Sequence, residues 1–168
     1  NPYLGEDSLA PFVDVALAHD KGLFVCVRTS NPGADVVQNQ RTADGRLLYE
    51  VVADLVSGFN ERAIGESGFG SIGAVVGATQ ADAAHKLRAR LPRTLFLVPG
   101  FGAQGGALDT VRACFDARGR GAVVNSSRAV MYPDRFGPSS ALVGGDGPRE
   151  RIRQAGQDFV AQVRSALR

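Results

Sequence analysis

The sequence predicts an α/β fold built around a parallel β-sheet. Short, uninterrupted apolar runs alternate with longer segments whose apolar residues recur at helical spacing. The runs lack polar–apolar alternation, which is typical of strands covered on both faces of a parallel sheet. With 168 residues, 44% of them hydrophobic, the chain has the length and composition of one globular domain.

The first expected elements are a helix near residues 8–19 and a strand at 23–27. Asp7 and Ser8 suit the N-terminus of a helix, because their side-chain oxygens accept hydrogen bonds from free backbone N–H groups. The strand ends at a cluster of turn-forming residues, 29–33. These features predict that the chain turns directly after its first strand.

A second helix is expected at 47–59, followed by a loop at 64–73 and a strand at 74–77. The loop is expected because the segment is rich in Gly and Ser. The helix residues expected to face the core are Leu48, Val51, Val52 and Leu55.

The remaining elements repeat the same order. They are a helix capped by Thr79 or Asp82, a strand at 95–98, a helix at 108–117, a strand at 122–124, a loop at 133–147 and an amphipathic helix at 149–167. One helix followed by four strand–helix units predicts a parallel sheet. Ligands bind such sheets at the C-terminal ends of the strands, so we expect functional residues in the loops that follow the strands.

Charge and cysteine content exclude several classes of partner and site. The excess of 19 Lys and Arg over 17 Asp and Glu is too small to predict a nucleic-acid or membrane-surface partner. No apolar segment approaches the roughly 20 residues of a membrane span.

Cys26 and Cys114 lie in apolar runs and are expected to be buried, reduced and inert. No spacing of His, Cys or carboxylate residues matches a metal site.

The strongest functional signal is the glycine-rich segment 98–106, VPGFGAQGG, which lies between an expected strand and an expected helix. Its four glycines let the backbone turn sharply and direct several N–H groups toward one anion. Gln104 adds an amide donor. The pattern favours a phosphate site, and a glycine-rich turn without a ligand is the alternative.

A second phosphate candidate, Asn125-Ser126-Ser127-Arg128, follows the next strand. Hydroxyl groups, backbone N–H groups and a guanidinium all suit a phosphate. The loops after the last two strands of a (β/α)₈ barrel often share one phosphate site, so the two segments are more informative together. In the 29–33 turn, Ser30 could hydrogen-bond a polar ligand edge, but taken alone this segment favours a plain turn.

At these three loops the sequence resembles orotidine 5′-phosphate decarboxylase, in particular the bacterial type 2 subfamily. The matching segments are NPYLGEDSLAPF, VRTSNPGA, IGESGFGSIGAVVGAT, LVPGFGAQGG and AVVNSSRAVMY. The resemblance implies a (β/α)₈ TIM barrel of which this chain supplies about the last four βα units. Residues 1–132 would be the C-terminal half of that barrel, with its phosphate-binding loops. Residues 133–168 would be a loop and C-terminal helix of the same domain.

The resemblance also implies an activity and a set of site residues. The family converts orotidine 5′-phosphate to UMP and carbon dioxide without a metal or an organic cofactor. The implied substrate-binding residues are Ser30, Pro99, Gly102, Gln104, Ser127 and Arg128. Ser30 would read the pyrimidine edge, while Gln104 and Arg128 would hold the phosphate. Ser127 stands where the wider family usually has Gly, so the backbone is expected to approach the phosphate slightly differently.

The family's catalytic Lys and Asp residues lie upstream of the segment that resembles NPYLG, so none is assigned within the chain. The two lysines present, Lys21 and Lys86, are expected away from the ligand-binding loops. We therefore expect the chain to be the C-terminal half of the enzyme. Alone, its 168 residues are expected to be inactive and poorly soluble.

The expected partners are orotidine 5′-phosphate or UMP and the missing N-terminal half of the barrel. A homodimer is left open, and the expected location is cytoplasmic. Two other functions also remain open at this point. One is a non-catalytic phosphate- or nucleotide-binding module that uses the same loops. The other is a different phosphate-binding barrel enzyme, such as a sugar-phosphate isomerase, against which the joint presence of TSNPG and GAQGG argues.

Overall fold

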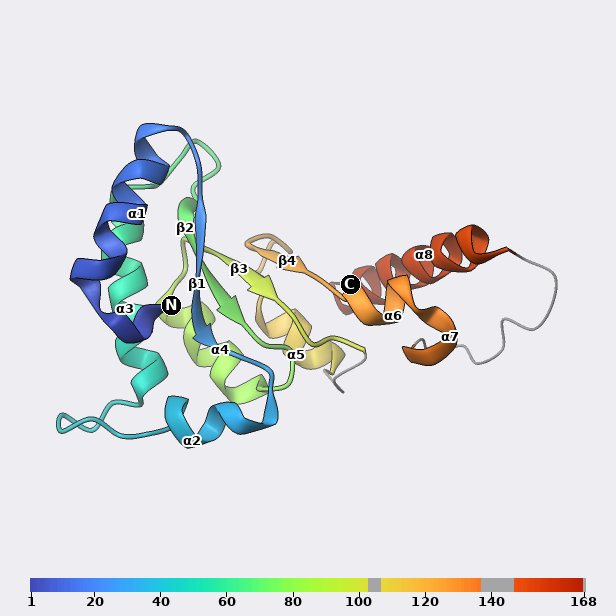
Figure 1. Cartoon of the computed structure of the whole chain (residues 1–168), viewed down its shortest axis with the longest axis horizontal. Helices are drawn as coiled ribbons and strands as arrows, with labels where there is room; N and C mark the ends of the chain where they lie inside the picture. Colours follow the sequence, from blue (N-terminus) through green and yellow to red (C-terminus); the bar gives the residue numbers. More distant parts are fainter. Residues whose placement is uncertain (103–106, 137–146, 168) are drawn as a thin grey trace.

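The computed structural model describes residues 1–102, 107–136 and 147–167 (Figure 1). Its centre is a four-stranded sheet in the order β1-β2-β3-β4, in which each neighbouring pair is parallel. The strands are β1 (Leu23–Arg28), β2 (Gly70–Val76), β3 (Thr94–Val98) and β4 (Ala122–Val124). Each strand therefore pairs with the next strand along the chain, which confirms the α/β prediction.

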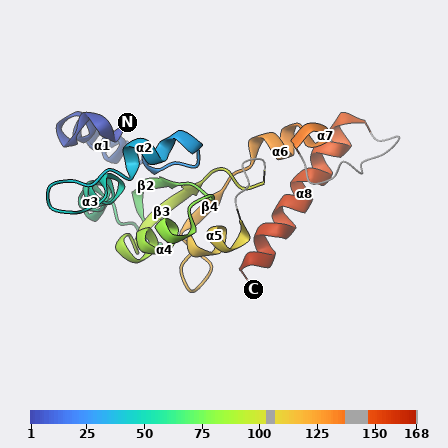
Figure 2. The ribbon, with the colours of Figure 1, turned by 90° about the horizontal axis from the view of Figure 1, so that it is seen from below.

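Helices connect the strands and extend beyond β4. They are η1 (Pro2–Leu4), α1 (Glu6–Ala18), η2 (Pro32–Ala34), α2 (Asp35–Gln38), α3 (Leu48–Glu61), α4 (Ala81–Arg90), α5 (Leu108–Ala113), α6 (Ser127–Met131), α7 (Pro133–Phe136) and α8 (Pro148–Ala166). Figure 2 shows α3, α4 and α5 along one side of the sheet, with α6, α7 and α8 beyond β4. No described helix is long and apolar enough to cross a lipid bilayer.

The sheet face toward α3, α4 and α5 forms the hydrophobic core. The buried strand residues on this face are Val25, Val27, Ile72, Ala74, Val76, Phe96 and Val98. They join one cluster with Ala53 and Val56 of α3 and Leu87 of α4. Fully burying one Val, Leu or Phe side chain stabilises a fold by about 1.5–3 kcal/mol, so this layer stabilises the packing of the helices on the sheet.

The opposite face of the sheet is partly open, which corrects the expectation that both faces of the strands are covered. Phe24 is 47% exposed and Val123 is 51% exposed, and Cys26 is exposed rather than buried. The strand register places Cys26 beside Val75, then Leu97, then Val123 in one row across the sheet. The apolar runs thus supply two apolar faces, of which this chain covers one. Cys114 is buried as expected, and burial raises the pKa of its thiol to about 12.

The expected loop at 64–73 was wrong over its last four residues, because β2 begins at Gly70. The two glycines that lie within β2, Gly70 and Gly73, serve close packing rather than a turn. A Cβ on Gly70 would lie 1.9 Å from Oδ1 of Asn60, and one on Gly73 would lie 2.5 Å from the ring of Phe24. Asn60 accepts a hydrogen bond from the Ile72 N–H and donates to the carbonyl of Arg93. It thereby links α3 to both central strands.

The helices also depart from the prediction in their details. The core-facing side of α3 carries Tyr49, Ala53, Val56, Phe59 and Asn60, whereas Leu48, Val51, Val52 and Leu55 are only half-buried. The N-cap of α4 is Gln80, and α5 ends at Ala113. The helices α2 and α6 are too short to produce a periodic apolar pattern in the sequence.

The expected C-terminal loop and helix are only partly as predicted. The short helix α7 replaces the start of the expected loop at 133–147. It is one helical turn, and its first residue, Pro133, is buried. The part of that loop at 137–146 lies outside the described residues. The final helix is confirmed as α8, and Leu167, just after its last residue, is 37% exposed.

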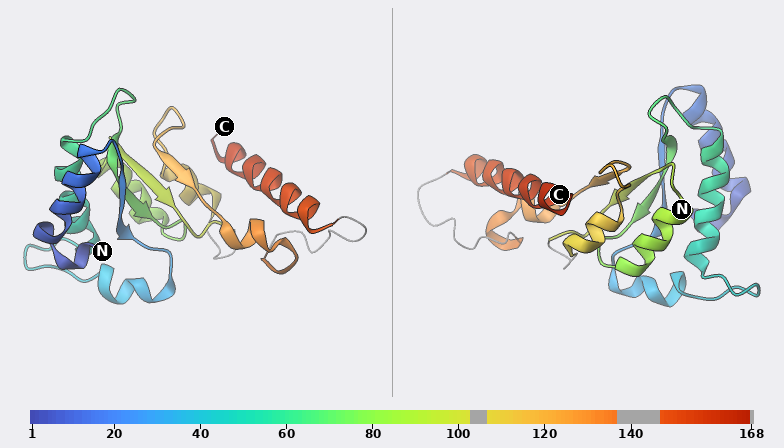
Figure 3. Two further views of the ribbon diagram at one scale, coloured as in Figure 1. Left: turned by 45° about the horizontal axis from the view of Figure 1, so that its top comes forward. Right: turned by 180° about the vertical axis from the view of Figure 1, so that it is seen from behind.

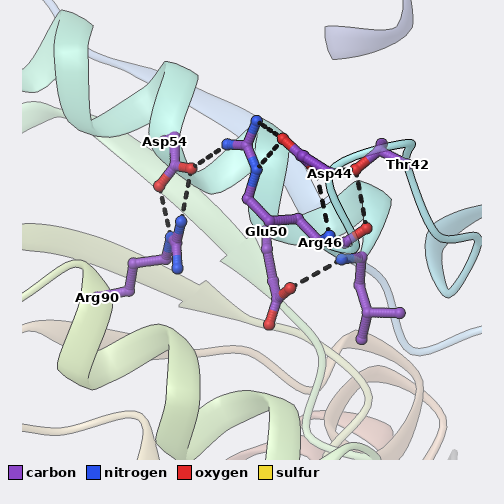
Figure 4. Close-up of polar contacts among 7 residues, drawn as sticks. Thr42, Asp44, Arg46, Glu50, Asp54 and Arg90 are labelled. Carbon is purple, nitrogen blue, oxygen red and sulfur yellow. Dashed lines mark hydrogen bonds and ion pairs between the residues drawn. The ribbon is translucent and has the colours of Figure 1, made fainter.

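A network of alternating charges ties the long β1–α3 connection to two helices (Figure 4). Arg46 donates from Nη1 to Oδ2 of Asp54 at 2.7 Å and from Nη2 to Oδ2 of Asp44 at 2.6 Å. Arg90 of α4 donates from Nη2 to the same Asp54 oxygen at 2.6 Å. The hydrogen bond from Arg90, with that from Arg46, holds the pKa of Asp54 below its usual range.

Replacing Gly70 tests whether close packing selects glycine in β2. Gly70→Ala should lower the free energy of unfolding by about 1–3 kcal/mol, because its Cβ would overlap Asn60. Gly58→Ala in α3 is the matched control, since a methyl group there would have open space for 4 Å around it. That change should raise stability by about 0.5–1 kcal/mol through helix propensity. Urea denaturation measures both, and equal midpoints for the two variants would contradict the packing account.

The charge network predicts a pH-dependent contribution to stability. Because the folded-state pKa of Asp54 is lowered, its contribution is fully present above the ordinary carboxyl pKa of about 4 and is lost as the pH falls through the lowered value. Asp54→Asn should cost less than about 1 kcal/mol at pH 7, since the pair is partly exposed. The difference from the parent chain should shrink below about pH 4. Urea denaturation across pH 2–8 checks this, and a difference that grows in acid would contradict it.

Candidate functional site

The C-terminal ends of all four strands lie along one edge of the sheet, which we call the carboxyl edge. It comprises the strand ends and the residues that directly follow them. Backbone hydrogen bonds join these ends in series. The N–H of Gly77 donates to the carbonyl of Arg28 at 2.7 Å, and that of Ala78 donates to Pro99 at 2.8 Å. The N–H of Asn125 donates to Val98 at 3.1 Å, so the loops expected to bind ligand are brought together.

The two phosphate candidates contact each other directly. Oγ of Ser126 donates to the carbonyl of Phe101 at 2.9 Å, which joins the β4–α6 loop to the glycine-rich loop. Gly100 and Gly102 have φ values of 92° and 82°, a region that favours glycine. A Cβ on Gly102 would lie 3.5 Å from Oγ of Ser126. That distance is an ordinary contact, so the positive φ of Gly102, rather than a lack of space, is what favours glycine at this position.

The residues predicted to bind phosphate are placed to different extents. Ser127 and Arg128 lie in the first turn of α6 and are exposed. The guanidinium of Arg128 lies 5.8 Å from the ring centroid of Phe136 in α7, within reach of a cation–π contact. Pro99 is half-buried at the end of β3. Gln104 lies outside the described residues.

The glycine-rich loop is anchored on the other side by an aromatic contact. Phe101 is buried, and its ring centroid lies 5.9 Å from that of Phe159 in α8. Tilted aromatic pairs at this distance stabilise a contact beyond the area they bury. The C-terminal helix thus supports the loop that the sequence assigned to phosphate, a role that sequence reasoning did not give it.

Ser30 lies at the same edge, directly after β1, and is half-buried. Its backbone is close to the residues that follow β2. A Cβ on Gly77 would lie 2.6 Å from the Ser30 nitrogen, and Oγ1 of Thr79 donates to the Ser30 carbonyl at 3.3 Å. Gly77 and Thr79 were missed as site residues. Their signal is the Gly-Ala-Thr sequence that directly follows an apolar run.

The described part of the carboxyl edge carries hydrogen-bond donors but no lysine. Lys21 is exposed and precedes β1, which places it at the opposite edge, as expected. Lys86 is exposed on the helix α4. Hydroxyl groups, a guanidinium and loop N–H groups suit an anion and a polar ring. Among the described residues, no cluster of three or more His, Cys, Asp or Glu side chains could hold a metal ion.

The sequence comparisons all identify relatives from one family. The model of the orotidine 5′-phosphate decarboxylase / HUMPS family matches residues 1–134. Over 132 residues the chain is 50% identical to orotidine 5′-phosphate decarboxylase of Rhodopirellula baltica and 46% identical to that of Caldicellulosiruptor bescii. Each alignment covers 79% of this chain and 43% of the relative. The chain thus spans less than half the length of these curated relatives.

Solved structures show the same relationship. The chain superposes on a putative orotidine 5′-phosphate decarboxylase from Streptomyces avermitilis with a TM-score of 0.72 and 36% identity, covering 99% of this chain and 52% of that one. Against Leishmania donovani OMP decarboxylase the TM-score is 0.63 at 36% identity, with coverage of 96% and 55%. The fold corresponds to part of the barrel of these enzymes, and the chain belongs to the orotidine 5′-phosphate decarboxylase / HUMPS family.

Proposed function

We propose that this chain is the phosphate- and pyrimidine-binding part of an orotidine 5′-phosphate decarboxylase. The observation that carries the proposal is the joining of both phosphate candidates by the Ser126–Phe101 hydrogen bond, at the same edge as Ser30. The proposed substrate is inferred from family membership, because the relatives are named for decarboxylation of orotidine 5′-phosphate. The proposed products are UMP and carbon dioxide.

The proposed residue roles follow from the chemistry of the two ends of the substrate. Arg128 gives the phosphate a charge-assisted hydrogen bond. The loop around Pro99 and Gly102, with Gln104 and Ser127, supplies further donors. Ser30 hydrogen-bonds the polar edge of the pyrimidine. The substrate is thereby held at both ends, so that its reacting carbon has a fixed position.

The reaction itself needs groups that we place on strands outside these residues. When the bond to the carboxylate breaks, its electron pair stays on the ring carbon, which must then receive a proton. A proton donor must come within about 2.6–3.2 Å of that carbon. Lys21 and Lys86 lie away from the carboxyl edge, so we assign the donor to a Lys of the N-terminal half of the barrel.

The open sheet face supports this assignment of a second half. Phe24, Cys26 and Val123 are exposed on one sheet face, which the strands of a closed barrel would cover. The proposed partner is therefore the missing N-terminal half, in the same polypeptide or as a separate one. We also propose a cytoplasmic location, since both cysteines are free thiols, as is usual in a reducing compartment.

Reconstitution tests the proposed function. The 168-residue chain should not decarboxylate orotidine 5′-phosphate alone. Co-expression with the part of the Rhodopirellula baltica relative that lies outside the aligned region should restore turnover. Turnover by the isolated chain, with its mass verified, would refute the assignment of the proton donor. A complex that binds UMP without turnover would instead support a non-catalytic nucleotide-binding module.

Removal of the guanidinium tests phosphate binding. Arg128→Ala should weaken UMP binding roughly tenfold or more, because a charge-assisted hydrogen bond contributes about 1.5–3 kcal/mol. Binding of uridine, which lacks the phosphate, should change little. Arg135→Ala is the matched control, since Arg135 also contacts the Phe136 ring but lies on α7. Isothermal titration calorimetry measures each affinity, and equal losses for UMP and uridine would exclude this role.

Removal of the Ser30 hydroxyl tests pyrimidine recognition. Ser30→Ala should weaken UMP binding by about three- to tenfold, because one neutral hydrogen bond contributes about 0.5–1.5 kcal/mol. Ribose 5-phosphate has no base, and its affinity should stay the same. Ser71→Ala, an exposed serine near the start of β2, is the control. If ribose 5-phosphate loses as much affinity as UMP, Ser30 does not read the base.

A further inference from the structure

A buried arginine lies two residues before the proposed pyrimidine-reading residue, Ser30. Arg28 is the last residue of β1 and only 1% exposed. Its guanidinium forms an ion pair with Asp35, donates from Nη1 to Oε1 of Gln38 at 3.0 Å and lies 5.9 Å from the ring centroid of Tyr49. A buried charge is tolerated only when it is paired and hydrogen-bonded, so Arg28 fixes the start of α2 beneath it.

Gln38, at the end of α2, uses the same amide to hold Thr29. Its Oε1 accepts a hydrogen bond from the Thr29 N–H at 2.9 Å, and its Nε2 donates to Oγ1 of Thr29 at 2.9 Å. The Thr29 hydroxyl in turn donates to Oδ1 of Asn31 at 2.7 Å. Both residues that flank Ser30 are therefore held, one directly and one through Thr29.

The other side of Ser30 is held by the residues that follow β2. Thr79 donates its hydroxyl to the Ser30 carbonyl, and Gly77 leaves room for the Ser30 backbone. The segment around Ser30 thus lies between a polar support from α2 and a backbone support from β2. The support from α2 is separate from the phosphate loops, because the Gln38 amide bonds to residues 28 and 29.

We infer that Gln38 is a positioning residue for pyrimidine recognition, acting through Thr29 on the pose of Ser30. This inference rests on the proposed function. A hydroxyl discriminates a base edge only where its distance and angle to that edge are fixed, since hydrogen bonds weaken steeply with misalignment. Loss of the Gln38 amide leaves the Thr29 N–H without its acceptor and removes the donor to the Thr29 hydroxyl oxygen, whereas the Thr29–Asn31 hydrogen bond and the Arg28–Asp35 ion pair remain.

Two glutamines near the end of α2 provide a matched comparison. In Gln38→Ala, UMP affinity should fall by about three- to tenfold, no more than in Ser30→Ala, because Gln38 acts only through the pose of that one hydroxyl, while ribose 5-phosphate affinity stays within about twofold. Gln40 donates to the carbonyl of Val36 and is exposed, so Gln40→Ala should match the parent chain. Gln38→Glu keeps the acceptor for Arg28 and for the Thr29 N–H, so it should recover most of the UMP affinity. Calorimetry on the chain in complex with the co-expressed N-terminal half gives all of these values.

Amide hydrogen exchange of Thr29 and Ser30, followed by NMR, separates this inference from the proposed function. Both amides should exchange faster in Gln38→Ala than in Gln40→Ala. Unchanged UMP affinity in Gln38→Ala, or an equal loss for ribose 5-phosphate, would overturn the inference. If the parent chain binds neither ligand, the proposed function fails. The exchange rates then decide whether Gln38 holds the segment, because unchanged rates would overturn that as well.

Discussion

The structure depends on one constraint, which is that four consecutive strands are parallel and pair in chain order. Every connection must then run back to the edge where the strands begin. The loop that follows each strand therefore lies at the opposite, carboxyl edge. Backbone hydrogen bonds from Gly77, Ala78 and Asn125 convert that shared direction into contact between neighbouring loops. The strand order alone therefore brings the candidate loops together, and the side chains then decide what they can bind.

The two faces of the sheet differ, because one is packed against helices and the other is partly exposed. Helices α3, α4 and α5 lie along one face of the sheet (Figure 3), and their apolar side chains pack against it in one buried cluster. The other face exposes Phe24, Cys26 and Val123 and continues toward the carboxyl edge. A complete barrel would enclose this face, which agrees with a chain that spans 52% of the Streptomyces avermitilis structure. The same surface is thus a candidate for both barrel closure and access to the bound substrate.

Sequence reasoning recovered what depends on local pattern. The apolar runs located all four strands, and their order placed the 29–33, 98–102 and 125–128 segments at one edge. It missed the start of β2, because Gly70 and Gly73 resemble loop residues until the side chains of Asn60 and Phe24 are placed against them. The short helices α2 and α6 have too few residues for a periodic signal.

The contacts that join the loops of the candidate site could not be predicted from the sequence, because they too depend on residues that meet only in the fold. The Ser126–Phe101 and Thr79–Ser30 hydrogen bonds join residues far apart in the chain, and nothing local distinguishes these hydroxyls from others. Likewise, Arg28 ends an apolar strand, where burial of a charge is visible only once Asp35 and Gln38 fold over it.

A titration of the isotopically labelled chain with UMP, followed by amide chemical shifts, tests most directly whether the carboxyl edge is one ligand-binding surface. Shifts are expected at Ser30, Gly102 and Arg128 together, with the opposite edge around Lys21 and Gly70 unchanged. They should approach saturation with a single dissociation constant, because one ligand contacts all three loops. Shifts confined to the opposite edge, or separate constants for the Ser30 and Arg128 loops, would contradict a shared site.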